Sequence, residues 1–204
     1  MPCFKSSNIA PKVVKDCLKY VDKVICIDDC CPENTGKIIK KEISDPRVVV
    51  LFHSRNKGVG GATKTGIKYA LSENAEIIIK IDSDGQMSPD LIPELIKPLL
   101  EKRAEFTKGN RFRSPDVLIK MPLIRLIGNL GLSFLTKLST GYWELFDPTN
   151  GFIAFSRNTI SRIPLMKIDN RYFFETDLLF RLSLSDTLIE EISMQPLYKN
   201  EKSS

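Results

Sequence analysis

The chain has 204 residues, 42% of them hydrophobic and 27% charged, and a net charge of +5. These values suit one soluble globular domain and exclude a low-complexity or disordered chain. No stretch reaches the ~18 uncharged apolar residues of a membrane-spanning helix. The five cysteines have no secretory signal before them, so reduced thiols fit better than disulfides or a zinc site.

Apolar runs and helical periodicities alternate along the first half of the chain. We expect helices over 9–20, 35–43, 60–72 and 89–103, and strands over 23–28, 47–52, 76–81 and 105–112. Ser88 followed by Pro89 is a typical helix start. Strands and helices that alternate at this spacing indicate a parallel, doubly wound α/β sheet.

The second half begins with a basic, leucine-rich region. Eight basic and two acidic residues lie between Lys102 and Lys137. This excess of positive charge could bind phosphate, an anionic membrane or nucleic acid, or it could simply form a solvated surface. Residues 117–139 carry apolar side chains at helical spacing, which fits either core packing or a helix lying on a membrane. The expected elements after them are strands over 151–156 and 187–194 and a helix over 174–185.

Carboxylates follow two of the expected strands. Asp28 and Asp29 end the first one, and Asp82 and Asp84, with Gln86 nearby, follow the run that begins at residue 76. Open α/β sheets bind ligands at the carboxyl ends of their strands. Oxygen donors there suit a divalent cation that keeps positions open for phosphate oxygens, although a strand that merely ends in a polar turn would look the same.

Other polar motifs are less specific. Asp147 lies in an Asp-Pro-Thr-Asn-Gly-Phe segment, and Glu175 and Asp177 open an expected helix, where they would also complement the helix dipole. The glycines of 56–62 depart from the dinucleotide spacing, so close approach to a nucleotide or to the sheet explains them equally well. His53 is the only histidine, which disfavours a Ser-His-Asp mechanism and suggests local packing or hydrogen bonding.

In this order, these motifs resemble those of the family 2 glycosyltransferases, inverting enzymes of GT-A fold that use nucleotide sugars. The resemblance rests on Met1–Lys5, Asp28–Thr35, Asn56–Ala62 and Asp82–Gln86. Within the family, the chain is most similar to the polyprenyl-phosphate sugar transferases, through Gly109–Phe112, Arg125, Asp147–Phe152 and the polar tail after Tyr198.

The resemblance implies a Rossmann-like GT-A fold with a mostly parallel central sheet and helices on both faces. It implies one catalytic domain over 1–204, with a nucleotide-sugar half at about 1–112 and an acceptor- and membrane-facing half at about 113–204. The first strand would be shortened, because no hydrophobic strand precedes Met1. Together with the missing transmembrane helices of relatives, this suggests a truncated reading frame or an isolated catalytic domain.

The implied activity is metal-dependent transfer of a hexose from a UDP- or GDP-sugar to a polyprenyl phosphate at the cytoplasmic face of the membrane, without a nucleic-acid partner. The implied site residues fall into three groups: Pro2, Phe4, Asp28, Asp29, Lys57, Gly58 and Asp82 for the donor, Asp82, Asp84 and Gln86 for Mg²⁺ or Mn²⁺, and Arg111 and Arg125 for the acceptor phosphate. A phosphate acceptor is ionised near neutral pH and needs no strong base.

Two alternatives remain open at this point. The acceptor could be a sugar hydroxyl in polysaccharide or lipopolysaccharide assembly, with Asp177 as the general base. The chain could also be an inactive remnant, since Lys5 stands where the family has asparagine and Cys31 where it has serine.

Overall fold

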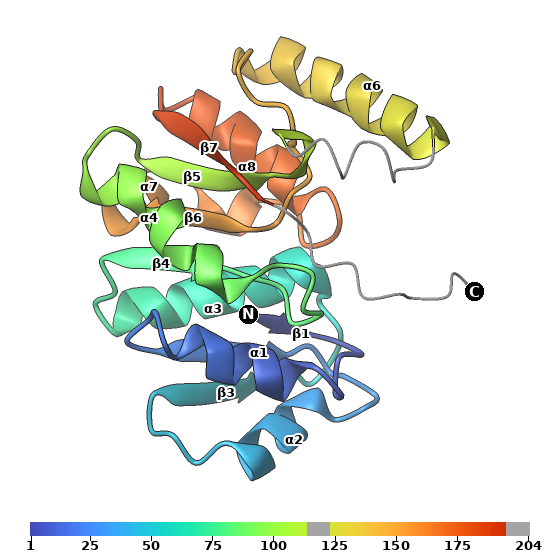
Figure 1. The fold of residues 1–204 in the computed structure, drawn as a ribbon, viewed down its shortest axis with the longest axis vertical. Helices are drawn as coiled ribbons and strands as arrows, with labels where there is room; N and C mark the ends of the chain where they lie inside the picture. Colours follow the sequence, from blue (N-terminus) through green and yellow to red (C-terminus); the bar gives the residue numbers. More distant parts are fainter. Residues whose placement is uncertain (114–122, 195–204) are drawn as a thin grey trace.

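A computed structural model describes residues 1–113 and 123–194 (Figure 1). The expected elements occur there within a few residues of their expected bounds, except that residues 117–122 of the helical pattern expected over 117–139 lie outside the described ranges. The helices are α1 Ala10–Cys17, α2 Thr35–Glu42, α3 Gly58–Ser72, α4 Ile92–Leu100, α6 Leu123–Thr140, α7 Arg157–Ser161 and α8 Phe174–Ser183, with short 3-10 turns at Pro89–Leu91, Arg111–Arg113 and Leu165–Lys167. The strands are β1 Pro2–Cys3, β2 Val24–Asp28, β3 Val48–Phe52, β4 Ile77–Lys80, β5 Phe106–Asn110, β6 Ile153–Ser156 and β7 Ile189–Ser193.

The strands form two sheets in the described ranges. One has the order β1-β2-β3 with both pairings parallel, and the other has the order β4-β6-β5-β7. In the second sheet β5 and β7 are parallel, while β6 runs antiparallel to both of its neighbours. The expected α/β fold with a mostly parallel sheet is therefore confirmed.

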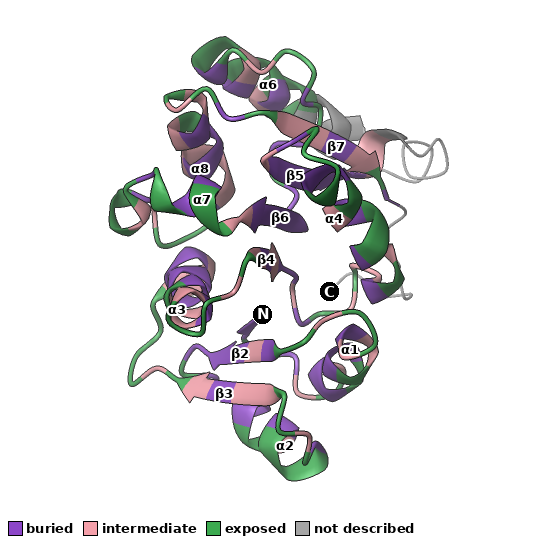
Figure 2. Ribbon diagram, turned by 90° about the vertical axis from the view of Figure 1, so that its left-hand side faces the viewer, coloured by how far each residue is buried: buried purple, intermediate pink, exposed green. Residues whose placement is uncertain are grey.

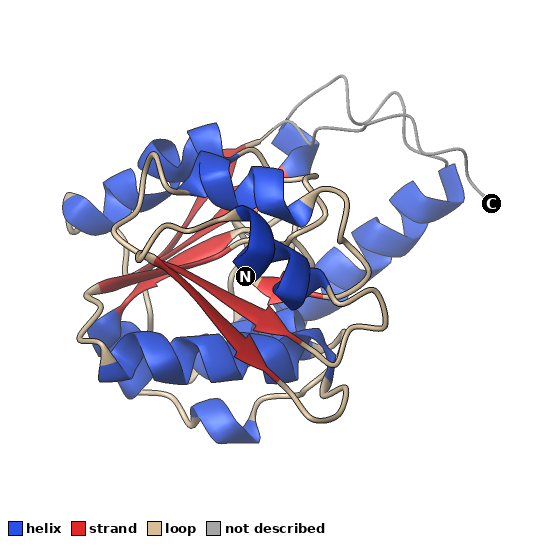
Figure 3. Cartoon of the chain, turned by 90° about the horizontal axis from the view of Figure 1, so that it is seen from below, coloured by secondary structure: helices blue, strands red, loops and turns tan. Residues whose placement is uncertain are grey.

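Helices cover both faces of the strands (Figures 2 and 3). On one face, α1, α2 and α4 contribute Val14, Ile39 and Leu95 to a core cluster that also contains Cys26 of β2. On the other face, α3, α7 and α8 contribute to a second cluster, with Ile67, Ile160 and Leu178. Because the strands are covered on both sides, their side chains are apolar in long runs rather than alternating.

The helix α6 lies at one end of the molecule, next to α8 (Figure 1). Its side chains are described at residue 128 and from residue 130 onward. Its exposed apolar side chains are Leu130, Phe134, Leu135 and Leu138. No helix in the described ranges is long and apolar enough to cross a bilayer.

The loops after β1 and β4 meet at the carboxyl edge of the strands. Ser6 Oγ and Ser83 Oγ form a buried hydrogen bond of 2.7 Å, three residues beyond the end of each strand. The Asp29 N–H also donates to the Cys3 carbonyl oxygen at 3.2 Å. These contacts bring the polar segments that follow β1, β2 and β4 to one edge of the molecule.

Candidate active site

The carboxylate of Asp28 organises the loop between β2 and α2. It is 4% exposed, and its two oxygens accept hydrogen bonds from the Cys31 and Gly36 N–H groups, each at 2.7 Å. Gly36 lies in the first turn of α2, where backbone N–H groups stabilise an anion, and Cys31 lies in the loop before that helix. Both oxygens of Asp28 are thus used within the protein.

Asp29 connects the loop to the start of α3. Its carboxylate accepts the Lys57 N–H at 2.9 Å and the Gly58 N–H at 2.8 Å, and it lies 2.6 Å from Nδ1 of His53. The other ring nitrogen of His53 lies 2.9 Å from the Thr65 hydroxyl. His53 therefore hydrogen-bonds locally, as expected, and the Asp29 carboxylate holds the glycine-rich turn.

The glycines of that turn allow a close approach of the segment before α8. A Cβ atom on Gly58, whose φ is +83°, would lie 2.5 Å from the Asn170 carbonyl oxygen, and one on Gly60 would lie 2.5 Å from that of Asp169. The Gly61 N–H donates to the Asn170 oxygen at 2.9 Å. The structure thus shows a close approach of this turn to the segment before α8 rather than to the sheet.

The expected metal ligands and one expected acceptor arginine line the same pocket. This pocket has a volume of about 110 Å³. Its lining residues are Asp82, Asp84, Gln86, Met87, Arg111, Thr149, Asn150, Gly151 and Met194. The Gln86 N–H donates to Asp84 Oδ1 at 3.0 Å, which closes the turn after β4. Segments far apart in the sequence are thus brought to one opening.

The donor set fits a divalent cation that takes few protein ligands. Asp82 and Asp84 offer carboxylate oxygens and Gln86 an amide oxygen beside the same pocket, the hard donors that Mg²⁺ and Mn²⁺ prefer. No group of three or more His, Cys, Asp or Glu side chains with metal-binding geometry occurs in the described residues. A cation here would complete its coordination with phosphate oxygens or water.

Lys80 is a buried partner of Asp82 that the sequence did not reveal. Its ammonium lies 2.9 Å from Asp82 Oδ1 and 3.1 Å from Glu175 Oε1. Burial alone would lower the pKa of Lys80, but the carboxylates of Asp82 and Glu175 raise it above its ordinary value. A Cβ on Gly151 would lie 2.1 Å from the Lys80 nitrogen, so a larger residue at this position would displace the end of the Lys80 side chain.

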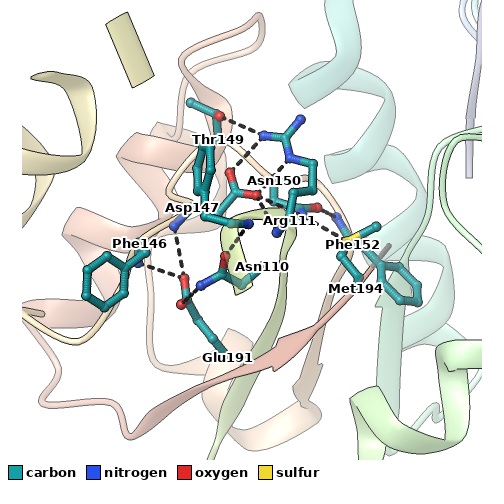
Figure 4. A network of polar contacts seen from close by, with 10 residues as sticks. Asn110, Arg111, Phe146, Asp147, Thr149, Asn150, Phe152, Glu191 and Met194 are labelled. Atoms are coloured by element: carbon teal, nitrogen blue, oxygen red, sulfur yellow. Dashed lines mark hydrogen bonds and ion pairs between the residues drawn. The ribbon is translucent and has the colours of Figure 1, made fainter. Parts of the chain in front are cut away.

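Arg111, which also lines the pocket, is held by Asp147 (Figure 4). Its Nε and Nη2 atoms donate to the two carboxylate oxygens at 2.8 and 2.7 Å, and its backbone N–H donates at 3.0 Å. Asp147 is fully buried. Burial would raise the pKa of Asp147, but hydrogen bonds from Arg111 and the charge of Lys108 hold it below its usual range. This bidentate ion pair fixes the orientation of the guanidinium plane.

A second polar layer supports that pair from β5 and β7. Glu191 accepts hydrogen bonds from the Phe146 and Asp147 N–H groups at 3.0 and 3.1 Å, and from the Asn110 side chain (Figure 4). Lys108 is 1% exposed. Burial lowers its pKa to about 8, although the negative charges of Asp147 and Glu191 act to raise it. Arg111 of the pocket lining is therefore connected to an extended buried polar network.

The remaining expected site residues lie elsewhere. Asp177 accepts the Asp169 N–H at 2.8 Å and pairs with Arg181 at 3.0 Å, outside the 110 Å³ pocket. Glu175, two residues earlier, is the member of that cluster that approaches Asp82, through Lys80. Pro2 is buried and Phe4 is exposed at the end of β1. The side chain of Arg125 lies outside the described ones.

The sequence matches a known family. The model of the family described as "Glycosyl transferase family 2" matches residues 1–163. The chain is 31% identical over 212 aligned residues to the UDP-N-acetylglucosamine–dolichyl-phosphate N-acetylglucosaminyltransferase of Methanococcus voltae, across 97% of this chain and 84% of that protein. It is 27% identical to the undecaprenyl-phosphate mannosyltransferase of Micrococcus luteus, across 83% of this chain and 69% of that one.

The fold is also found in solved structures. The glucosyl-3-phosphoglycerate synthase of Mycobacterium tuberculosis, crystallised with Mn²⁺, UDP and glucosyl-3-phosphoglycerate, superposes with a TM-score of 0.72 at 18% identity. The match covers 98% of this chain and 70% of that structure.

Proposed function

Because this chain belongs to glycosyl transferase family 2, we propose that it transfers a hexose from a UDP- or GDP-sugar to a polyprenyl phosphate with the help of Mg²⁺ or Mn²⁺. The observation that carries the proposal is the pocket shared by Asp82, Asp84, Gln86 and Arg111. It offers oxygen ligands for a cation and a fixed guanidinium for an anion within one opening. The related transferases named for dolichyl and undecaprenyl phosphate support the choice of acceptor.

On the donor side, Asp82, Asp84 and Gln86 would hold the cation against the diphosphate of the nucleotide sugar. The cation supplies neutralising charge for the departing nucleoside diphosphate. Lys80 keeps the Asp82 carboxylate in place through the 2.9 Å ion pair and adds a buried positive charge behind it. The chain thus positions the diphosphate and stabilises the charge that it gains.

On the acceptor side, Arg111 would bind and orient the lipid phosphate, with Arg125 as a second arginine. An acceptor oxygen then forms a bond to the sugar C1 as the bond from C1 to the diphosphate oxygen breaks, and the nucleoside diphosphate leaves. The Arg111 plane is set in advance by Asp147, so little ordering is needed when the phosphate arrives. No proton has to be removed from an ionised phosphate.

For the nucleoside, we propose contacts near the loops that Asp28 and Asp29 hold. The carboxylates of both residues already accept backbone hydrogen bonds, so their role would be to shape the binding surface. The exposed side chains of Phe4 and Lys57, together with Pro2 and the Gly58 turn, would supply the contacts to the base and ribose.

The geometry favours a phosphate acceptor over a sugar hydroxyl. A hydroxyl needs a carboxylate base near the reacting atoms. Asp177 is paired with Arg181, and Glu175 with Lys80, so the described carboxylates of this cluster already serve as partners of cations. A carboxylate that is held in an ion pair is poorly placed to accept the proton of an incoming hydroxyl.

A polyprenyl phosphate acceptor lies in a membrane, and α6 is the candidate membrane-contacting element. Its apolar residues Leu135 and Leu138 are 61% and 65% exposed. Lys137 lies 3.6 Å above the Phe146 ring, close to the same surface. Apolar side chains next to a cation suit insertion between anionic headgroups.

Product chemistry tests the proposal. The protein is incubated with vesicles that contain polyprenyl phosphate, with labelled UDP- and GDP-hexoses and with Mn²⁺ or Mg²⁺. We expect a lipid-linked sugar that mild acid releases, as for a glycosyl phosphodiester. An acid-stable glycoside would contradict the phosphate acceptor, and the absence of transfer from every donor would contradict the activity.

A further inference from the structure

Lys80, the last residue of β4, carries a buried ammonium group that contacts an expected ligand of the cation. Its side chain is 3% exposed, and its nitrogen lies 2.9 Å from Oδ1 and 3.1 Å from Oδ2 of Asp82. The ammonium thus contacts both oxygens of this carboxylate. A cation that binds Asp82 has to share the carboxylate with a positive charge that is already there.

Glu175 offers the ammonium of Lys80 a second partner. It lies in the first turn of α8, its side chain is 11% exposed, and its Oε1 atom is 3.1 Å from the Lys80 nitrogen. Lys80 lies between two carboxylates and therefore keeps its charge. Because Glu175 is present, the ammonium can lean away from Asp82 without being left unpaired, which would be costly for a buried charge.

The three charged groups meet at a residue of the pocket wall. That residue is Gly151, which lines the pocket together with Asp84. A Cβ atom there would lie within 3.2 Å of charged atoms of Lys80, Asp82 and Glu175. The positive charge of Lys80 is therefore located directly behind the surface to which the cation and the diphosphate would bind.

This charge should act on the two proposed ligands in opposite directions. A positive charge at Asp82 repels a divalent cation, and the repulsion is strong because Lys80 is buried. The charge of Lys80 also reduces the negative charge that the site offers, on which the affinity for a divalent cation depends. A diphosphate, in contrast, is attracted by an ammonium group.

We propose that Lys80 is a positioning residue that acts as an internal counter-cation of Asp82 and keeps the affinity for the metal ion low until a nucleoside diphosphate binds. The diphosphate oxygens then supply the negative charge that Lys80 cancels, and Glu175 keeps the ammonium paired while Asp82 is shared with the cation. The inference rests on the proposed function, because it takes Asp82 and its neighbours as the cation ligands. It gives a reason why a lysine and a glutamate lie behind them.

The affinity for Mn²⁺ without nucleotide tests the proposal, measured from the electron paramagnetic resonance signal of free Mn²⁺. In Glu175→Gln, Asp82 remains the carboxylate partner of Lys80, so Mn²⁺ binding should weaken at least about threefold. The double variant Lys80→Met/Glu175→Gln removes the counter-cation and its partner together, so Mn²⁺ binding should tighten at least about tenfold at unchanged net charge. The matched control is Lys97→Met/Glu101→Gln, which removes an exposed pair and should leave the affinity unchanged.

Binding of UDP and GDP in the presence of a chelator gives a second readout. The double variant lacks the ammonium of Lys80, so calorimetry should show binding of the preferred nucleotide that is at least about threefold weaker than in the parent chain. A gain in Mn²⁺ affinity together with a loss in nucleotide affinity is a result that a merely structural role of Lys80 does not give, because a distorted site would lose both.

Contrary results are distinct from a failure of the proposed function. Weaker Mn²⁺ binding in the double variant would mean that Lys80 only holds Asp82 in place, and unchanged binding would mean that its charge does not act on the cation; either result would overturn the proposal. If the double variant does not fold, Glu175→Gln decides, because it leaves Lys80 paired with Asp82, and equal or tighter Mn²⁺ binding would then overturn the proposal. None of these readouts depends on transfer, so a chain that shows the shifts but makes no lipid-linked product would contradict the proposed function alone.

Discussion

At the scale of single residues, the site is built from charges that are buried in pairs. Lys80 lies between Asp82 and Glu175, and Arg111 is clamped by Asp147. Buried charges of this kind cost free energy unless they are paired and hydrogen-bonded. They hold the pocket in one arrangement, and removing one partner leaves the other uncompensated.

Replacing Arg111 by Ala should destabilise the protein strongly. Asp147 is fully buried and would lose its bidentate partner, which typically costs about 3–5 kcal/mol in the free energy of unfolding. Urea denaturation measures this cost. The matched control is Arg162→Ala, which removes an arginine from the surface pair with Glu105 and should cost at most about 1 kcal/mol. Equal losses in the two variants would contradict a structural role for the Arg111–Asp147 pair.

Lys108 should make stability depend on pH in the alkaline range. Its pKa is about 8 in the folded protein and ~10.4 when unfolded, so between these values the unfolded chain binds more protons. The Lys108 contribution to the free energy of unfolding therefore rises with pH from about 8 to about 10, by on the order of 3 kcal/mol.

The variant Lys108→Met isolates this contribution. Its stability relative to the parent chain should be highest near pH 7 and should fall toward pH 10, because the parent gains stability there and the variant does not. Urea denaturation at several pH values measures the difference. A difference that stays constant from pH 7 to pH 10 would mean that Lys108 does not titrate in this range.

At the scale of elements, the site is built from short segments next to three strands. The turn after β4 supplies Asp82, Asp84 and Gln86, the residue after β5 is Arg111, and the segment before β6 supplies Asp147. The motifs were visible in the sequence because each one follows an apolar run. Their assembly was not, because β6 enters between β4 and β5 in antiparallel direction, and strand order depends on long-range pairing.

Lys80 is the clearest case of a missed site residue. It was counted within the apolar run of 76–81, although Lys80 and Asp82 are two positions apart and share one face of the strand. That spacing was the available signal. Its partner Glu175 comes from 95 residues further along the chain, so no local pattern could have joined them.

The surface of α6 should mediate binding to lipid vesicles. Leu138 on α6 and Leu100 at the end of α4 are equally exposed, at 65% and 63%, and form a matched pair. We expect Leu138→Ser to weaken binding to anionic vesicles roughly tenfold, because burial of one apolar side chain contributes about that much to affinity. Leu100→Ser should have little effect. Vesicle sedimentation measures both, and equal effects would contradict a role of α6 in membrane binding.

At the scale of the whole molecule, the α/β class and the helices on both faces could be predicted from the alternation of strands and helices, and both are confirmed. The division of the strands was not predicted: in the described residues β1-β2-β3 and β4-β6-β5-β7 are separate sheets, and a cavity of about 630 Å³ is lined by both β2 and β4. Periodicity reveals which segments form strands, but it does not give the space between them.

The central claim is that Asp82, Asp84 and Gln86 hold a cation that is needed for sugar transfer, and the transfer rate as a function of Mn²⁺ concentration tests it most directly. The chain as it stands is compared with Asp84→Asn and with Glu94→Gln, which removes the same charge from an exposed position on α4. We predict transfer that a chelator abolishes, a loss of at least about 100-fold in Asp84→Asn and an unchanged rate in Glu94→Gln. Transfer that persists without metal, or that is equal in the two variants, would contradict the account.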